Sequence, residues 1–331
     1  MKLHEKNTPK NRRALHIALA VCVTLILFVS LYGNYAALSN STETFKSKFN
    51  LLNPIISIVN KYDLLVGFRE LRTYLNETYT SYPGYTVGIY FEYLPTGDNI
   101  SVNQNSRIWP ASLVKIPVAM AVMKKVEKGV WNFDNELVIL DDDKDSTYGD
   151  LYREPTGTSY SIRDMLMATL GKSDNTAHYV LLRNLDPIEL EDVYVKIGLD
   201  DIIEALKLSP KEEEQDNRIT AKRYSTFFRA LYNSTYLGPE YSQMFLGFLE
   251  AAPKENLEFG LPEGVRFIHK TGVRTDQNVW ADSGIVYVPG RPYLLTVMIQ
   301  KKDPGQPQSG EVENLFKTIS EKVYFHVTNA Q

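Results

Sequence analysis

The sequence predicts an α+β fold in which one antiparallel sheet is completed by segments from distant parts of the chain. Strand patterns occur between residues 85 and 104 and again between 265 and 302, and the region between them is mostly helical in pattern. An apolar run near the N-terminus precedes both. We therefore expect one transmembrane helix followed by a five-stranded antiparallel sheet, flanked by helices and carrying a mostly helical insert.

The apolar run has the composition of a membrane helix. Residues 14 to 32, ALHIALAVCVTLILFVSLY, contain no Asp, Glu, Lys or Arg, and a helix of this length nearly crosses a hydrocarbon core of ~30 Å. Residues 1 to 13 carry a net charge of +4, which predicts a cytoplasmic tail, a single pass through the cytoplasmic membrane and an extracytoplasmic remainder. A cleavable signal peptide is the alternative, but the run exceeds the roughly 7 to 15 residues of such a region and no clean Ala-x-Ala site follows it.

Charge and cysteine content exclude several functions. The chain has 331 residues and a net charge of −4, so the part beyond the +4 tail carries −8, which argues against nucleic acid as a partner. The only cysteine, Cys22, lies in the apolar run, so the outer domain has no disulfide and no thiol chemistry. No His-Glu-x-x-His pattern occurs. We expect a monomer without a metal or cofactor.

The first elements after the membrane helix are a linking segment and a hairpin. Residues 33 to 80 form either a juxtamembrane stalk or a docking segment, with Pro54 as an interruption. A globular domain is expected over residues 81 to 331. It opens with YTVGIYFEYL and ISVNQ, two alternating segments joined by TGDN, which predict a two-stranded hairpin.

The remaining elements follow from periodicity. From Ala111 to about Asn233 the pattern is helical, and Ser161 is expected to cap the helix that follows it. The segments VRFIHKTGV, ADSGIVYVPG and RPYLLTVMIQKK predict three strands, and GEVENLFKTISEKVYFHV predicts a terminal amphipathic helix. The acidic runs at 141 to 145 and 211 to 216 are expected to be solvated loops without chemistry.

The stretch WPASLVKIPVAMAVM, residues 109 to 123, places a serine and a lysine three positions apart in an apolar run. Ser112 and Lys115 share one face of a helix start, so the hydroxyl and the amine can reach hydrogen-bonding distance. Apolar surroundings disfavour the ammonium, which turns the lysine into a neutral base near pH 7 that activates the serine. Pro117 is tolerated if the helix begins near Ala111. Alone, the pair fits better a core lysine whose ammonium reaches solvent, because Ser-x-x-Lys is expected by chance in a chain of this size.

Two further motifs follow in order, Ser173-Asp174-Asn175 at a helix junction and Lys270-Thr271-Gly272 in a strand. Together with Ser-x-x-Lys they resemble the three motifs of the penicillin-recognising serine enzymes, the class A β-lactamases and the penicillin-binding proteins. The resemblance covers roughly residues 80 to 331, and its spacing is closer to class A than to large transpeptidases.

The resemblance implies a role for each residue of the first two motifs. Ser112 would be the acylated nucleophile and Lys115 its proton acceptor. Ser173 would relay a proton to the leaving nitrogen, and Asn175 would orient Lys115 and the substrate amide.

The third motif implies a substrate-binding strand. Lys270 and Thr271 would hold a substrate carboxylate, and Gly272 would allow close approach. The backbone N–H groups of Ser112 and Val273 would form the oxyanion hole.

Two features depart from class A. The position of an arginine that class A enzymes often carry on the next strand is matched by Ser283, and Arg274 is either its substitute or a solvated turn arginine. Class A enzymes also need a glutamate that activates water for deacylation. The segment from 198 to 219 lacks the E-x-x-L-N pattern; Glu204 is nearest to the expected place, and the glutamates at 212 to 214 lie later.

The expected function is a membrane-anchored, class A-like serine β-lactamase that forms an acyl-enzyme with β-lactams, hydrolyses it and so gives antibiotic resistance. The alternative is a penicillin-binding D-alanyl-D-alanine-type peptidase or transpeptidase that acts on peptidoglycan stem peptides and deacylates β-lactams slowly or not at all. A non-catalytic binding domain is disfavoured because all three motifs are intact. His269 should face away from Lys270 on its strand, so we expect it to be structural.

Overall fold

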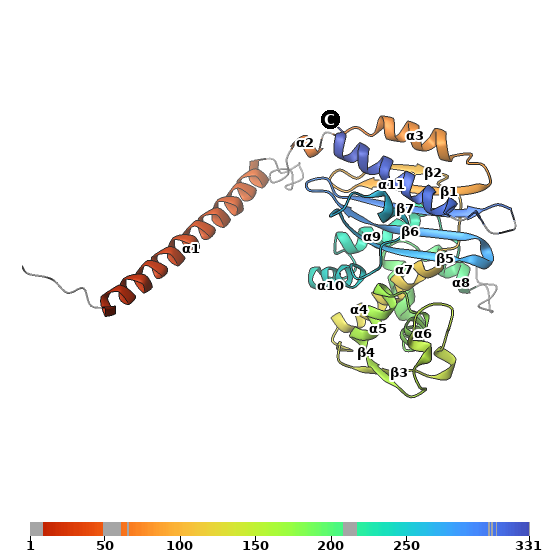
Figure 1. The fold of residues 1–331 in the computed structure, drawn as a ribbon, viewed down its shortest axis with the longest axis horizontal. Coiled ribbons are helices and arrows are strands. Elements are labelled where there is room, and N and C mark those ends of the chain that lie inside the picture. Colours follow the sequence, from red (N-terminus) through yellow and green to blue (C-terminus); the bar gives the residue numbers. More distant parts are fainter. Residues whose placement is uncertain are drawn as a thin grey trace, which may run out of the picture. The chain divides into compact units, whose positions relative to one another are not determined.

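The computed structural model describes residues 9–48, 61–64, 66–207, 217–303, 305, 307–308 and 310–330. The chain divides into two compact units, Met1–Leu65 and Val66–Gln331. Figure 1 shows a long helix in the first unit and a sheet covered by helices in the second.

The first unit contains α1 (Pro9–Lys48) and the short α2 (Lys61–Leu64). Within α1, the segment His16–Ala36 is long and apolar enough to cross a membrane, with a mean hydropathy of 2.2 and none of it buried inside the protein. Side chains such as Leu25 and Phe28 are exposed along it. The expected N-terminal apolar helix is confirmed, although a signal sequence near an N-terminus also meets this criterion of length and composition.

The second unit is built on one five-stranded antiparallel sheet with the order β2-β1-β7-β6-β5. Its strands are β1 (Tyr85–Tyr93), β2 (Asp98–Val102), β5 (Arg266–Arg274), β6 (Val279–Tyr287) and β7 (Tyr293–Lys301). β1 pairs with β7 over its whole length, from Tyr85 opposite Lys301 to Tyr93 opposite Tyr293. This pairing confirms that the sheet joins segments from far apart in the sequence.

One face of the sheet is covered by α3 (Arg69–Tyr79) and α11 (Glu311–Asn329), which lie together in Figure 1. Leu71 and Leu75 of α3 are fully buried in the same apolar cluster as Phe316 of α11. The compact unit therefore begins at Val66 rather than at residue 81, because α3 buries its apolar stripe against the sheet.

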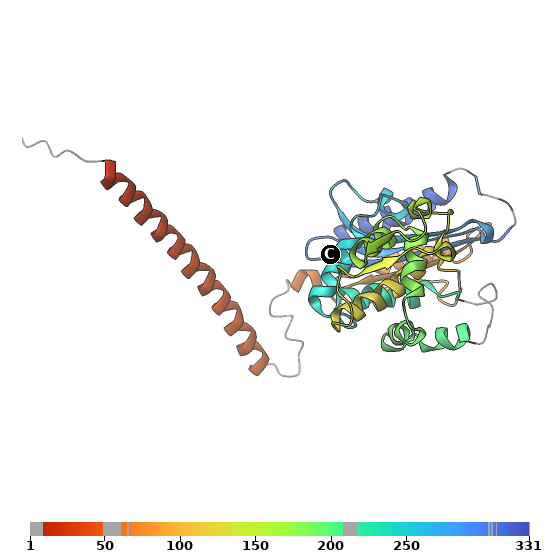
Figure 2. The same cartoon turned by 90° about the horizontal axis from the view of Figure 1, so that it is seen from below.

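The other face carries the predicted helical region, which Figure 2 shows in yellow and green in front of the sheet. Ser161 caps α5 as expected, since its hydroxyl accepts a hydrogen bond from Asp164 N at 3.1 Å. The helices are α4 (Lys115–Glu127), α5 (Ile162–Gly171), α6 (Asn175–Arg183), α7 (Pro187–Lys196), α8 (Asp200–Lys207), α9 (Ala221–Tyr232) and α10 (Pro239–Leu249). A small sheet of β3 (Glu136–Val138) and β4 (Ser159–Ser161) was not predicted, because three residues are too few to show an alternation.

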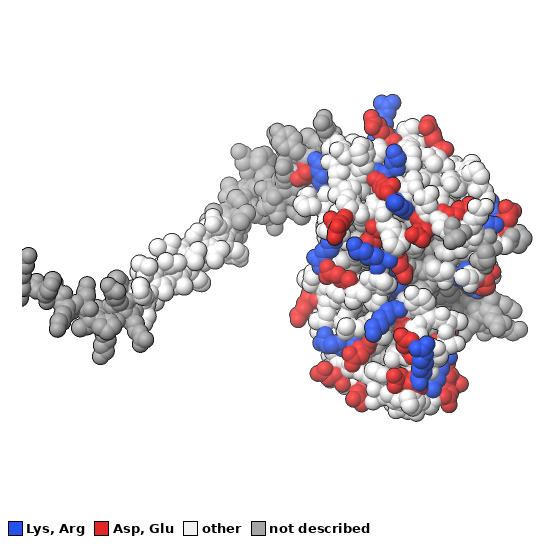
Figure 3. Space-filling model, viewed as in Figure 1, with Lys and Arg blue, Asp and Glu red and all other residues white. Residues whose placement is uncertain are grey.

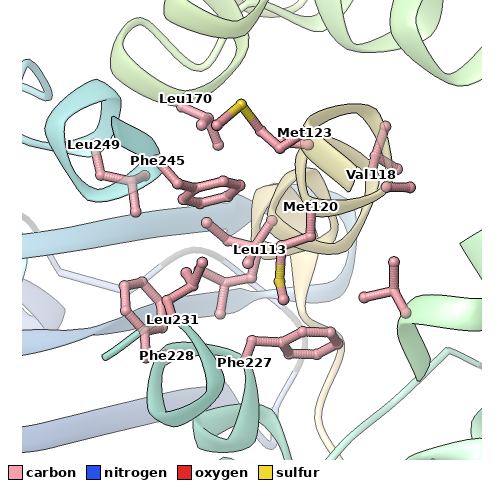
Figure 4. Close-up of a cluster of buried hydrophobic side chains, with 14 of the residues drawn as sticks. Leu113, Val118, Met120, Met123, Leu170, Phe227, Phe228, Leu231, Phe245 and Leu249 are labelled. Atoms are coloured by element: carbon pink, nitrogen blue, oxygen red, sulfur yellow. The ribbon is translucent and has the colours of Figure 1, made fainter. Parts of the chain in front are cut away.

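Helix α4 lies at the centre of this layer, and Figure 4 shows its methionines among side chains of α5, α9 and α10. Met120 and Met123 are fully buried, as are Phe227 of α9 and Phe245 of α10. Burial on nearly all sides explains why residues 116–123 of α4 are all apolar, and it makes the helix a rigid support for residues at its N-terminus.

Charged side chains lie on the surface of the second unit, but some acidic residues are buried. Figure 3 shows acidic and basic side chains interspersed over the visible face of the second unit. The expectation of a solvated loop is wrong for Asp143, which is 2% exposed and accepts a hydrogen bond from Arg183 Nε at 2.8 Å. The sequence does not single out Asp143 within its acidic run, because its partner Arg183 lies on a helix far along the chain. The second acidic run, at 211 to 216, lies outside the described residues.

Candidate active site

Ser112 lies in a 3₁₀ turn, Ala111–Val114, that leads directly into α4. Ala111 has a φ of 50°, in the left-handed region that costs energy for residues with a side chain. Pro117 falls in the first turn of α4, where its missing N–H removes no helical hydrogen bond. Ser112 therefore sits at the positive end of a 13-residue helix, which favours negative charge.

Lys115 is the centre of a hydrogen-bonded cluster and is only 1% exposed. Its Nζ lies 3.2 Å from Ser112 Oγ and 3.1 Å from Ser173 Oγ. It also donates to the Ser173 carbonyl and to Asn175 Oδ1, both at 2.6 Å. The structure thus brings together residues of the first two motifs that are about sixty positions apart.

The electrostatic surroundings of Lys115 favour its neutral form. Burial lowers the pKa of the ammonium, and the nearby charge of Lys270 lowers it further. The carboxylates of Asp174 and Asp145 oppose these effects, and the pKa comes to about 7 instead of 10.5. An amine with this pKa is partly unprotonated at neutral pH and can accept a proton.

The Ser173-Asp174-Asn175 loop is held by the buried carboxylate of Asp174. Its Oδ1 accepts from Ala177 N at 2.9 Å, which caps α6. Its Oδ2 accepts from the backbone N–H groups of Asp150 at 2.7 Å and Leu151 at 2.9 Å. Asp174, rather than Ser173, is therefore the helix cap, and Ser173 is left with a φ of 55° and its hydroxyl directed to the lysines.

The Asn175 amide is oriented from both ends. Its Nδ2 donates to Asp145 Oδ1 at 3.0 Å and to Thr147 Oγ1 at 2.7 Å, which leaves Oδ1 for Lys115. Burial alone would raise the pKa of Asp145, but hydrogen bonds from Thr147 and Asn175 lower it below its usual value. Sequence reasoning missed both partners, because Asp145 belongs to the acidic run that was expected to be solvated.

The third motif lies on β5 and approaches the cluster from the opposite side. Lys270 is 3% exposed, and its Nζ donates to Ser173 Oγ at 2.8 Å and to the Thr271 carbonyl at 3.2 Å. Burial lowers the pKa of Lys270. The negative charges of Glu255 and Asp282 partly offset this shift, and the pKa comes to about 8. Ser173 Oγ therefore lies between two lysines, Lys115 and Lys270.

Gly272 shows the close approach that was expected. A Cβ at this position would lie 2.7 Å from the Pro110 carbonyl oxygen, 3.0 Å from Ser112 N and 3.2 Å from Ala111 Cβ. These atoms leave no space for a side chain, so glycine lets β5 pack directly against the turn that carries Ser112. The next residue, Val273, lines the same cleft as Ser112.

Thr271 has an unexpected partner. Its Oγ1 donates to Glu255 Oε2 at 2.6 Å. Glu255 precedes a 3₁₀ turn, Asn256–Gly260, in the loop between α10 and β5. No motif marks this glutamate in the sequence, because the contact depends on how the loop folds back over the strand.

Arg274 and Ser283 occupy different environments. Arg274 lines the cleft, with its Nε 3.2 Å from Asp276 Oδ1 and its guanidinium 4.6 Å from the ring centre of Trp109. Ser283 is fully buried and shares a hydrogen bond of 2.6 Å with Thr296 Oγ1. Ser283 therefore supplies no cation in place of an arginine, and a role for Arg274 toward substrate stays a prediction.

The glutamates expected for deacylation are only partly described. Glu204 lies in α8, with its side chain outside the described part of the structure, and Glu212 to Glu214 lie wholly outside it. His178 of α6 lines the cleft, and burial and the charge of Lys115 lower its pKa to about 3, so its imidazole is neutral.

His269 lies away from the cleft, as strand alternation predicts. Its Nδ1 is 2.9 Å from Asp282 Oδ1, its Nε2 is 3.4 Å from Glu258 Oε2, and its ring stacks on Phe267. Burial alone would lower the pKa of His269, but the two carboxylates raise it to about 9. This charged cluster ties the loop before β5 to the sheet.

Comparisons with known proteins agree with this architecture. The model of the beta-lactamase enzyme family matches residues 70–327. A β-lactamase of Bacillus amyloliquefaciens is 24% identical over 296 residues, which are 85% of this chain and 87% of that protein. Beta-lactamase VEB-1 of Pseudomonas aeruginosa is 30% identical over 88 residues, 26% of this chain and 29% of that protein.

Among solved structures, PBP-A has a TM-score of 0.67 at 22% identity, covering 78% of this chain and 95% of that one. A mutant of PBP-A, solved as an acyl-enzyme complex with penicillin G, has a TM-score of 0.66. The β-lactamase of Sphaerobacter thermophilus has a TM-score of 0.68 at 23% identity, covering 80% of this chain and 98% of that one. These similarities establish the fold, and the family match over most of the second unit shows that the chain belongs to the beta-lactamase enzyme family.

Proposed function

We propose that this chain is a serine β-lactamase in which Ser112 is acylated by β-lactams and the acyl-enzyme is then hydrolysed. The observation that carries the proposal is the position of Lys115 Nζ, which is buried within hydrogen-bonding distance of Ser112 Oγ, Ser173 Oγ and Asn175 Oδ1. The family match and the penicillin G acyl-enzyme of a PBP-A mutant support the same chemistry.

Acylation follows from these distances. Neutral Lys115 accepts the proton of Ser112, whose Oγ attacks the lactam carbonyl carbon. The carbonyl oxygen becomes an anion, which the N–H groups of Ser112 and Val273 stabilise at the helix N-terminus. When the lactam C–N bond breaks, Ser173 Oγ gives its proton to the leaving nitrogen and regains one from Lys115, 3.1 Å away. Lys270, 2.8 Å from Ser173 Oγ, keeps that hydroxyl in place.

Hydrolysis of the acyl-enzyme needs a base for water. Glu204 is the candidate that the resemblance provides, and it would accept a proton from the water that attacks the ester carbonyl. The ester bond to Ser112 then breaks, the proton taken by Glu204 passes to Ser112 Oγ to restore its hydroxyl, and the opened β-lactam leaves as a carboxylic acid.

The second candidate is a D-alanyl-D-alanine-type peptidase that is acylated by β-lactams but deacylates them slowly. The state of two carboxylates in the cleft, those of Asp145 and Asp276, favours the peptidase. Each is hydrogen-bonded to other side chains of the protein. Asp145 accepts from Asn175 and Thr147, and Asp276 is paired with Arg274. Burial alone would raise the pKa of Asp145, but hydrogen bonds from these partners lower the pKa of both carboxyl groups, and each is therefore a weaker base toward water.

We further propose that α1 anchors the enzyme in the cytoplasmic membrane with the second unit outside. The apolar segment His16–Ala36 and the basic residues before it support this topology. Both candidate substrates, β-lactams and peptidoglycan stem peptides, are met on that side of the membrane.

One assay on the full chain in detergent separates the two candidates. The protein is incubated with a fluorescent penicillin and with a chromogenic cephalosporin, and the labelled peptide is identified by mass spectrometry. We expect an adduct on Ser112. Sustained turnover of the cephalosporin supports the β-lactamase, and a single burst with a lasting adduct supports the peptidase. The absence of both an adduct and turnover would contradict both candidates.

The acylation rate constant is expected to be bell-shaped in pH. The rate should rise with pH as Lys115 loses its proton near pH 7, and it should fall as Lys270 loses its charge near pH 8. The two lysines interact, so the apparent values belong to the pair. At pH 6, one pH unit below the Lys115 pKa, about a tenth of Lys115 is neutral, so we expect a rate ~10-fold below the limit for the neutral amine. Rates of labelling by fluorescent penicillin between pH 5 and 9 test this, and a flat profile below pH 7 would count against Lys115 as the base.

A further inference from the structure

The substrate-binding strand already holds a carboxylate of the protein itself. Glu255 Oε2 accepts the hydrogen bond of Thr271 Oγ1 at 2.6 Å. Its charge also raises the pKa of Lys270 toward its usual value and contributes to the raised pKa of Tyr148. Glu255 therefore lies close to the two side chains, Lys270 and Thr271, that are proposed to receive a carboxylate of the substrate.

The loop that carries Glu255 is held in place by buried contacts. Leu257 is fully buried, and its N–H donates to Asp282 Oδ2 at 3.1 Å. Glu258 lies 3.4 Å from the charged His269, and its N–H donates to the Glu255 carbonyl at 3.0 Å. The position of Glu255 is thus set by the sheet through two neighbouring anchors.

We propose that Glu255 is a specificity-determining residue that disfavours a free carboxylate at Lys270 and Thr271 and favours an amidated carboxyl terminus there. The proposal rests on the proposed acylation of Ser112, because it concerns which acyl donor that site accepts.

Charge and hydrogen-bond capacity carry the argument. Glu255 already places a negative charge near Lys270 and on the hydroxyl of Thr271, so a second carboxylate beside Thr271 would meet a like charge at close range. A primary amide carries no charge; its N–H can donate to Glu255, and its carbonyl can accept from Lys270, while the Thr271 hydroxyl keeps its hydrogen bond to Glu255.

Neither the neighbouring strand β6 nor the end of β5 supplies a second unpaired cation for a substrate carboxylate beside Lys270. Ser283, which stands opposite Lys270 on β6, is buried and bonded to Thr296. Arg274, at the end of β5, is already paired with Asp276. A substrate carboxylate would therefore meet the charge of Glu255 beside Thr271, with Lys270 as the cation that both carboxylates share through space.

The test compares two acyl donors that differ only at this position, penicillin G and the primary amide of its ring carboxylate. Second-order rate constants for acylation of Ser112 in the full-length protein are measured by mass spectrometry. Glu255→Gln is the test variant, because glutamine keeps the shape and removes the charge. Glu263→Gln is the matched control, since Glu263 is an exposed glutamate in the loop that leads into β5.

We expect Glu255→Gln to shift the ratio of the two rate constants at least ~10-fold toward penicillin G, and Glu263→Gln to leave it at the wild-type value. An unchanged ratio in Glu255→Gln would overturn the inference, as would an equal shift in both variants. These results require that Ser112 is labelled. If neither compound labels Ser112 in any variant, the proposed function fails and the inference fails with it.

Discussion

Replacing Lys115 with alanine is expected to lower the rate of acylation of Ser112 by ~10²- to 10⁴-fold, the range for loss of a general base. The physical reason is the position of its amine, 3.2 Å from Ser112 Oγ, with a pKa of about 7. Among the side chains that the structure describes, no other lies within hydrogen-bonding distance of Ser112 Oγ to take its proton. The rate constant for labelling by a fluorescent penicillin measures the effect.

A second variant distinguishes the role of Lys115 as a base from that of its positive charge, and a third serves as a control. Lys115→Arg keeps a cation but cannot lose its proton at ordinary pH, so we expect a loss close to that of Lys115→Ala. Lys128→Ala removes an exposed lysine at the other end of α4 and should acylate at the wild-type rate. Acylation of Lys115→Ala near the wild-type rate would refute the assigned role, provided its thermal unfolding shows a folded protein.

Replacing Asp174 with alanine is expected to lower the free energy of unfolding by about 3 kcal/mol. Asp174 is 3% exposed, and its carboxylate accepts hydrogen bonds from the backbone N–H groups of Asp150, Leu151 and Ala177. Removal of the acceptor leaves these donors unpaired and deletes the cap of α6. Denaturant unfolding of the purified protein measures the loss.

The same substitution should also slow acylation, because Asp174 stands between Ser173 and Asn175 and holds their loop. Asp174→Asn keeps one acceptor oxygen and is expected to lose less stability than Asp174→Ala. Asp134→Ala removes an exposed aspartate and should change the free energy of unfolding by less than about 0.5 kcal/mol. A loss below about 1 kcal/mol in Asp174→Ala would contradict the role of the three hydrogen bonds.

Much of the fold was predictable because its signals are local. The alternation in β1 and the periodicity of α11 can be counted within one segment. Helix α3 was harder, because its apolar stripe indicates a helix without indicating the surface that it covers. The structure shows that surface to be the sheet and α11, which moves the start of the compact unit to Val66.

The candidate site was predictable where the interacting residues belong to the same short motif. Ser112 and Lys115 are three residues apart at a helix start, so their hydrogen bond follows from helical geometry. Asp145, Thr147 and Glu255 carried no such signal, because each meets its partner through the conformation of a loop. The local sequence around a charged residue in a polar loop is the same whether its side chain is solvated or bonded to a buried partner.

The sequence by itself determined the α+β class, the long apolar N-terminal helix, and the serine and lysine that share one helix face, since each depends on residues within a few turns of one another. Only the tertiary structure decided that the charges of Lys270, Asp174 and Asp145 also act on the pKa of Lys115. It alone decided that Ser173 lies between two lysines and that the hydroxyl of Thr271 donates to Glu255. Desolvation and Coulomb interactions depend on distances across the folded chain, and a linear pattern does not contain those distances.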